Sequence, residues 1–272
     1  MKESNLKPEN PIGIFNSGVG GLTVAYAIKK ALPNEKIIYF GDLAHLPYGE
    51  KSPEAIKSYA KDIVDFLLKK NCKSVVIACN SASAVAAKTV AKQIKNKAIL
   101  VTVIEPTANY VANNYSKKEV GVIGTKATIN SCIYPNTIRK INPTVKVKTK
   151  ATPLLVPIIE EGFKNSIISK ETLSVYLSSN ELKNIKAIVL GCTHYPIIKS
   201  QIKEYYGNGI EVIDSAKLVA SELKKLLTKK HLLNLKNKNP KHEFFVSDYT
   251  SVFEKTARIF FHSAIKLKQI KL

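Results

Sequence analysis

Arginine is scarce in this sequence, long apolar runs are missing, and the four cysteines form no CxxC pair. A membrane-spanning helix needs about 20 consecutive apolar residues, so the lack of such a run argues against one. Cysteines without that spacing, and histidines that do not cluster, argue against a structural metal site. The lack of a secretion signal argues against disulfides. These absences predict a cytoplasmic protein that binds neither a metal nor a membrane.

The net charge of +21 is carried almost entirely by lysine, since Arg139 and Arg258 are the only arginines. A basic surface is typical of nucleic-acid-binding proteins. Lysine lacks the planar fork with which arginine grips phosphates and base edges, and pairs such as Lys224-Lys225 are typical of solvated faces. We therefore expect no specific nucleic-acid partner. The charge suits an anionic small-molecule substrate instead.

Strand-like and helix-like segments alternate along the chain. Ser52 is suited to cap a helix and Pro53 to its first position, and the apolar residues that follow have helical spacing. The predicted strands are 36–40, 74–78, 99–104, 120–123, 187–190, 211–213 and 244–246. This alternation predicts the α/β class, with mostly parallel sheets.

The length of 272 residues predicts two domains. The boundaries are expected near Glu105-Pro106, where a buried-looking strand ends, and near Asp214-Ser215. The tail after the second boundary, expected to end in a helix, is too short for a core of its own. We therefore assign residues 1–104 and 215–272 to the first domain and residues 105–214 to the second.

Two cysteines follow runs of strand-forming residues. Cys79 lies in VVIACNSASA and Cys192 in IVLGCTHYP. Ligands bind at the carboxyl ends of parallel strands, so these thiols are candidates for reactive groups. Each is preceded by a comparable strand, in IGIFNS and in GVIGT, which indicates a distant internal duplication. The alternative for each is an inert buried cysteine, as we expect for Cys72 and Cys132, in half-buried packing positions.

The neighbours of the two thiols favour their ionisation. A helix is predicted to begin just after Cys79, and Cys192 is followed by His194 and by Pro196, which suits a first helical turn. A helix amino end or an adjacent histidine lowers the pKa of a thiol. Whether His194 handles protons or has only a structural role stays open at this point.

Two turns are candidate binding loops. The glycine-rich turn after the first strand, Asn16 to Gly21, could hold a phosphate, but it lacks the third glycine of a dinucleotide motif. A carboxylate suits the same backbone N–H groups. The turn Pro47-Tyr48-Gly49 is either a second binding loop or ordinary loop punctuation.

The segments IGIFNSGVGGLTV, DLAHLPYG, VVIACNSASA, GVIGT and LGCTHYP, in this order and spacing, resemble the glutamate racemases of bacterial cell-wall synthesis. The resemblance implies two similar, pseudo-twofold-related α/β domains with glutamate in the cleft between them, no cofactor and no metal. Cys79 and Cys192 would exchange protons with the α-carbon from opposite faces. Glu160 and His194 would assist them, as would Asn16. The implied substrate-binding residues are Asn16, Ser17, Tyr48, Gly49, Asn80, Ser81, Thr193 and His194. A homodimer is also implied.

The chain departs from the family pattern at Asn16, where the family has aspartate, and at Ser81, where it more often has threonine. Ser81 keeps a hydroxyl. An amide at position 16 cannot accept a proton from Cys79 as a carboxylate can, so we expect a slowed enzyme with its binding site intact. The alternatives are a racemase for aspartate or another amino acid, and an amino-acid-binding protein of the same fold with impaired catalysis.

Overall fold

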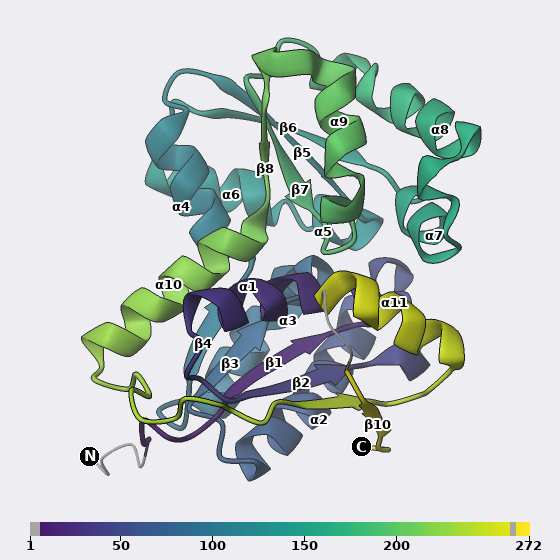
Figure 1. The fold of residues 1–272 in the computed structure, drawn as a ribbon. Helices are drawn as coiled ribbons and strands as arrows, with labels where there is room; N and C mark the ends of the chain where they lie inside the picture. Colours follow the sequence, from purple (N-terminus) through teal and green to yellow (C-terminus); the bar gives the residue numbers. More distant parts are fainter. Residues whose placement is uncertain (1–5, 262–264) are drawn as a thin grey trace. The chain divides into compact units, whose positions relative to one another are not determined.

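The computed structural model describes residues 6–261 and 265–272, and the chain divides into two compact units (Figure 1). Unit 1 combines the chain up to Val103 with the segment from Ala216 onward. Unit 2 is the continuous segment Ile104–Ser215. The chain therefore leaves unit 1, completes unit 2, and returns.

Unit 1 is built around a parallel sheet with the strand order β10-β9-β2-β1-β3-β4. Its central strands are apolar and buried on both faces, as is typical of parallel sheets covered by helices. The elements in chain order are β1 (Ile12–Asn16), α1 (Leu22–Ala31), β2 (Ile37–Gly41), the 3₁₀ turns η1 (Leu43–His45) and η2 (Tyr48–Glu50), α2 (Pro53–Lys69), β3 (Ser74–Ile77), α3 (Asn80–Ile94), β4 (Ile99–Thr102), α10 (Ser215–Lys229), β9 (Glu243–Val246), α11 (Ser251–Phe261) and β10 (Leu267–Gln269).

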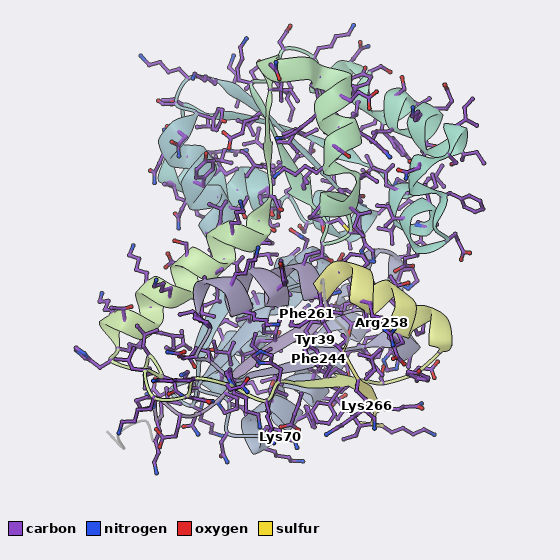
Figure 2. The ribbon with its side chains drawn as sticks, in the orientation of Figure 1. Tyr39, Lys70, Phe244, Arg258, Phe261 and Lys266 are labelled. Carbon is purple, nitrogen blue, oxygen red and sulfur yellow. The ribbon has the colours of Figure 1, made fainter. Side chains whose placement is uncertain are left out.

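Helices cover both faces of this sheet. Helix α1 packs beside α11 on one face, and α2 packs beside α3 on the other (Figure 1). Aromatic rings join α11 to the sheet (Figure 2). The ring of Phe261 lies edge-on to that of Phe244 of β9, with centroids 5.0 Å apart, and the centroids of the Phe244 and Tyr39 rings are 6.4 Å apart, Tyr39 being in β2. The carboxyl-terminal segment thus completes the core of unit 1.

Unit 2 contains a smaller parallel sheet with the order β6-β5-β7-β8. Helix α8 packs against both α7 and α9, and α4 packs against α6. The elements are α4 (Ile104–Asn114), β5 (Glu119–Gly124), α5 (Lys126–Asn130), α6 (Ile133–Ile141), β6 (Lys146–Ala151), α7 (Leu155–Glu160), η3 (Phe163–Asn165), α8 (Ile167–Leu177), η4 (Asn180–Leu182), β7 (Ala187–Gly191), η5 (Tyr195–Ile198), α9 (Lys199–Tyr206), η6 (Gly207–Gly209) and β8 (Glu211–Ile213).

The four strands of the unit 2 sheet correspond to four of the six strands of the unit 1 sheet. The order β6-β5-β7-β8 in unit 2 repeats the order β2-β1-β3-β4 in unit 1, as the predicted duplication requires. In each, the connections run in opposite directions from the first of the two central strands, β1 or β5. A crevice forms at the carboxyl ends of strands where the order reverses, here between β1 and β3 and between β5 and β7. The parallel α/β class is thereby confirmed.

A buried ion pair lies in unit 1 at the amino end of β3, away from the strand ends that carry the crevice. Lys73 lies just before β3 and is fully buried, and its Nζ donates to Glu35 at 2.5 Å. Its other contacts are the carbonyls of Pro8 and Leu232, and Glu35 accepts from the backbone of Asn234. Burial lowers the pKa of Lys73, and the Glu35 carboxylate opposes that effect. Because the charges satisfy each other, removing one would leave the other buried without compensation.

Several local predictions are confirmed and others are wrong. Ser52 caps α2, with its hydroxyl accepting from the N–H of Ala55 at 3.2 Å, and Pro53 is the first residue of the helix. The strand predicted over 99–104 ends at Thr102, because the chain turns into α4 at Ile104. The tail does not end in a helix, since β10 follows α11 and pairs with β9.

The two cysteines predicted to be half-buried differ from that prediction and from each other. Cys72 is fully enclosed, its Sγ only 3.0 Å from where a side chain at Gly13 would begin, and burial raises the pKa of its thiol to about 12. Cys132 is exposed, with φ +52° at the start of α6. Its position at a surface turn, not in a core, explains the difference. Over the described part of the chain, no helix is long and apolar enough to cross a membrane.

Candidate active site

Cys79 lies at the carboxyl end of β3 and caps α3. Its side chain is 5% exposed, and its Sγ accepts a hydrogen bond from the N–H of Ala82 at 3.5 Å. The thiol also lies 3.7 Å from Oγ of Ser17, to which it donates. Amide N–H groups at a helix start stabilise a thiolate. The sequence prediction that Cys79 stands at a helix amino end is confirmed by this geometry.

Asn80 and Ser81 form the first turn of α3 and are almost completely buried. Ser17 follows β1, the strand beside β3. The topological reversal between these two strands therefore brings Ser17, Cys79, Asn80 and Ser81 to the same end of the unit 1 sheet.

Asn16, the last residue of β1, is completely buried. Its Nδ2 donates to the carbonyl of Gly18 at 3.2 Å, and Tyr39 donates to the same carbonyl at 2.5 Å. Asn16 also has a side-chain hydrogen bond with Tyr39. Among the described residues, Oδ1 of Asn16 has no hydrogen-bond partner. Asn16 therefore serves as a donor that holds the glycine-rich turn.

Gly21 allows this turn to pack closely. A Cβ at Gly21 would lie 2.5 Å from Cβ of Asn16 and 2.9 Å from the hydroxyl of Tyr39. Burial, and then the charge of nearby Cys79, raise the pKa of Tyr39 well above its usual value, so its hydroxyl keeps its proton. The carbonyl of Gly18 thus accepts hydrogen bonds from two side chains of unit 1, those of Asn16 and Tyr39.

The turn at Tyr48 and Gly49 is held by a residue that the sequence reasoning did not single out. Tyr48 is 1% exposed and donates its hydroxyl proton to Oδ2 of Asp42 at 2.5 Å. Gly49 is partly buried beside it. The available signal was a carboxylate directly after a buried strand, since Asp42 follows β2.

Cys192 follows β7 in unit 2 and is 7% exposed. Its Sγ lies 3.7 Å from Nδ1 of His194, and Nε2 of His194 donates to Oε1 of Glu160 at 2.9 Å. Glu160 ends α7, so the carboxylate, imidazole and thiol form a chain of contacts. Thr193, which lies between the cysteine and the histidine in the sequence, is also buried. The predicted site residues of unit 2 thus come together.

The imidazole of His194 is almost completely buried between two groups that can be anionic. Burial by itself lowers the pKa of a histidine, but the hydrogen bonds and charges of Cys192 and Glu160 outweigh it and raise the pKa of His194 to about 10. A protonated His194 donates from both ring nitrogens and so stabilises a thiolate at Cys192. Pro196 lies in η5, so a 3₁₀ helix follows this thiol instead of an α-helix.

The residues around Cys79 in unit 1 and those around Cys192 in unit 2 form two half-sites, named after their cysteines. Neither half-site contains an evident metal centre. Within the described ranges, no three His, Cys, Asp or Glu side chains are grouped so as to hold a metal ion. The titratable groups of the half-sites are instead suited to moving protons, because each thiol has donors that stabilise its anionic form.

Known proteins are similar to this chain in sequence and in fold. Residues 12–223 match the family model described as Asp/Glu/Hydantoin racemase. A glutamate racemase of Chlorobaculum parvum is 41% identical over 260 residues, 96% of this chain and 95% of that protein. One of Geobacter metallireducens is 43% identical over 246 residues, 90% of each chain. The crystal structure of glutamate racemase from Francisella tularensis with D-glutamate has a TM-score of 0.91 at 38% identity, covering 97% of this chain and 98% of that one.

Proposed function

We infer that this chain, which belongs to the Asp/Glu/Hydantoin racemase family, interconverts L-glutamate and D-glutamate. The observation that carries the inference is the pair of buried thiols at equivalent strand ends of two sheets that share a four-strand order. The product D-glutamate would supply peptidoglycan synthesis, as the resemblance to bacterial cell-wall racemases implies. A cytoplasmic location and assembly as a homodimer are further proposals that rest on the same resemblance.

The proposed reaction uses the two thiols on opposite faces of one α-carbon. A thiolate removes the α-proton, so that an S–H bond forms, the C–H bond breaks, and its electron pair moves into the α-carboxylate. The opposite thiol then delivers its proton to the other face and becomes a thiolate. The α-proton of an amino acid is weakly acidic, so fixed donors must stabilise the developing charge. No net oxidation occurs in either direction.

The residues around each thiol suit particular roles in this scheme. A protonated His194 would stabilise the thiolate form of Cys192 by donating to it, and Glu160 would hold the imidazole in place; the 3.7 and 2.9 Å contacts support this. Ser17, Asn80, Ser81 and Thr193 would bind glutamate with hydroxyl and amide groups, together with Tyr48, Gly49 and His194. Asn16 would orient the turn beside Cys79, because its amide donates to Gly18.

Asn16 makes a slowed racemase the expected form of this activity. In the Cys79 half-site the thiol contacts a serine hydroxyl, and position 16 carries an amide in place of the family aspartate. Because the reaction interconverts mirror images, its equilibrium constant is one. Any loss in kcat/KM must therefore be equal in the two directions, although kcat and KM can change separately.

The deciding experiment is incubation of the purified protein with D-glutamate and separately with L-glutamate in deuterated buffer, without added cofactor. We expect deuterium at the α-carbon together with inversion from both enantiomers. Parallel incubations with aspartate and alanine would test the substrate, since exchange confined to aspartate would replace glutamate. Tight glutamate binding without any exchange would instead indicate an amino-acid-binding protein of this fold, which the unpartnered Oδ1 of buried Asn16 favours as the second candidate.

A further inference from the structure

We propose that Asp42 is a positioning residue of the racemase, whose buried carboxylate fixes the Tyr48 turn relative to the Cys79 half-site. This inference rests on the proposed function and adds a residue to it. Asp42 is 2% exposed and directly follows β2. It does not itself belong to the predicted substrate-binding residues, so its effect would pass through those that do.

Three side chains from three segments donate to this carboxylate. Tyr48 Oη lies 2.5 Å from Oδ2, Ser247 Oγ lies 2.7 Å from Oδ1, and Nδ1 of His45 lies 2.9 Å from both oxygens. A carboxylate is costly to bury unless such donors replace water, and hydrogen bonds to an ionised acceptor are among the strong ones. The position of each donor is therefore set by the carboxylate.

The bond to Asp42 defines what Tyr48 can offer a substrate. A phenol has one proton, and Tyr48 gives it to Asp42. Burial and the charge of Asp42 both raise the pKa of Tyr48, so the donor persists at all working pH values. Tyr48 thus contributes to binding through the placement of its ring and backbone, and that placement depends on Asp42.

The backbone of Asp42 is tied to the other side of the same half-site. Its N–H donates to the carbonyl of Asn16 at 3.0 Å, at the end of β1. The next residue, Ser17, contacts the thiol of Cys79. Asp42 thus connects the end of β1, whose next residue contacts the Cys79 thiol, with the turn that carries Tyr48.

The far side of the carboxylate is closed by the carboxyl-terminal segment and by His45. Ser247, just after β9, donates to Asp42 and accepts from the N–H of Ala44 at 2.9 Å. The ring of His45 stacks on Tyr59 of α2, with centroids 3.9 Å apart and planes at 11°. The carboxylate is therefore held from several directions, as a rigid positioning group requires.

The test compares Asp42→Asn and Tyr48→Phe, alone and combined, in the racemisation assay. Asp42→Asn keeps the shape of the side chain but replaces one of its two acceptor oxygens by an NH₂ group. The side chain can then no longer accept from all three donors at once. We expect KM for glutamate to rise about 10-fold or more in either single variant, the range of one buried hydrogen bond, with a smaller change in kcat. The double variant should be within about 3-fold of the worse single variant, because both changes remove the same interaction.

Glu35→Gln is the matched control, since it also changes a buried carboxylate of unit 1 into an amide, but the contacts it affects are those with Lys73 and with the backbone of Asn234. It should lower the melting temperature and leave KM unchanged. An Asp42→Asn protein that is folded and has the original KM would overturn the proposal, as would additive effects in the double variant or an equal rise in KM in Glu35→Gln.

Ser247→Ala decides the matter if Asp42→Asn does not fold, because it withdraws one donor from the same carboxylate. A rise in KM would support the proposal and an unchanged KM would overturn it. The proposed function fails separately: unsubstituted protein that exchanges no α-proton would refute the racemase assignment, whereas an active enzyme insensitive at Asp42 would refute this inference alone.

Discussion

Cys79 caps a helix and contacts a serine hydroxyl, whereas Cys192 precedes a 3₁₀ helix and contacts a histidine that is bound to a carboxylate. The strand ends that carry the two thiols are equivalent. What differs is how an anionic sulfur is stabilised: by neutral dipoles in unit 1 and by a charged imidazole in unit 2. The comparison teaches that a duplicated framework fixes where a thiol stands but leaves its proton chemistry to a few neighbouring side chains.

The strongest way to break this comparison is to remove each thiol. Both Cys79→Ala and Cys192→Ala should lower kcat/KM for either enantiomer by at least about 10²- to 10⁴-fold, the contribution of one acid/base group. Cys132→Ala is the control, because Cys132 is exposed and lies outside both half-sites, and its racemisation rate should be unchanged. A thiol whose removal leaves more than about a tenth of the activity would not be an acid/base group of this reaction.

Asn16→Asp would make the Cys79 half-site more like its counterpart by adding a carboxylate. We expect kcat to rise about 10²-fold, at the lower end for one acid/base group, in the assay with either enantiomer. The melting temperature should fall, because the hydrogen bond that the side-chain amide of Asn16 donates to the Gly18 carbonyl is lost. An unchanged kcat would show that position 16 does not limit turnover.

Tyr39→Phe provides the control for that substitution. In the Asn16→Asp protein, the hydroxyl of Tyr39 can donate to the new carboxylate instead of to Gly18. Tyr39→Phe should therefore destabilise the Asn16→Asp protein more than the unsubstituted protein in urea unfolding. Equal destabilisation in the two backgrounds would contradict this account.

The smallest expected effect concerns stability and sharpens the contrast in charge. The pKa of His194 is raised in the folded protein from its ordinary 6.5 to about 10. The stability that it contributes is therefore fully present below about pH 6.5 and is lost as the pH rises through about 10. In urea unfolding, His194→Gln should be more destabilising at pH 7 than at pH 10.

His231→Gln serves as the comparison variant, since His231 is exposed at the end of α10. Its unfolding midpoint should differ from that of the unsubstituted protein by the same small amount at both pH values. A His194→Gln destabilisation that does not change with pH would show that the charge of the imidazole does not stabilise unit 2.

Features set by neighbouring residues in the chain were predictable from sequence. The Ser52-Pro53 start of α2 and the start of α3 after Cys79 depend on local capping chemistry, which residue types reveal. The parallel sheets followed from alternating apolar strands and amphipathic helices. The thiols could be placed at strand ends for the same reason.

Features set by distant contacts were not predictable in the same way. β10 spans Leu267–Gln269 and exists because it pairs with β9, so its own pattern carries little signal. The surroundings of Asp42 depend on Ser247, which is distant in the chain and approaches it only in the folded unit. The β-branched residues after Thr102 resembled a continuing strand, but Pro106 is tolerated in the first turn of α4.

The return of the chain to unit 1 also has a consequence for biosynthesis. Unit 2 is continuous and has all its strands once Ser215 has been made, whereas the sheet of unit 1 still lacks β9 and β10. Until the segment from β9 to β10 has been made, β2 has an unpaired edge, Asp42 lacks its serine donor, and Phe244 and Phe261 are missing from the core. Domains fold as units during synthesis, and exposed strand edges promote aggregation. A ribosome that stalls shortly after Ser215 would therefore release a chain with one finished half and one half still open to aggregation.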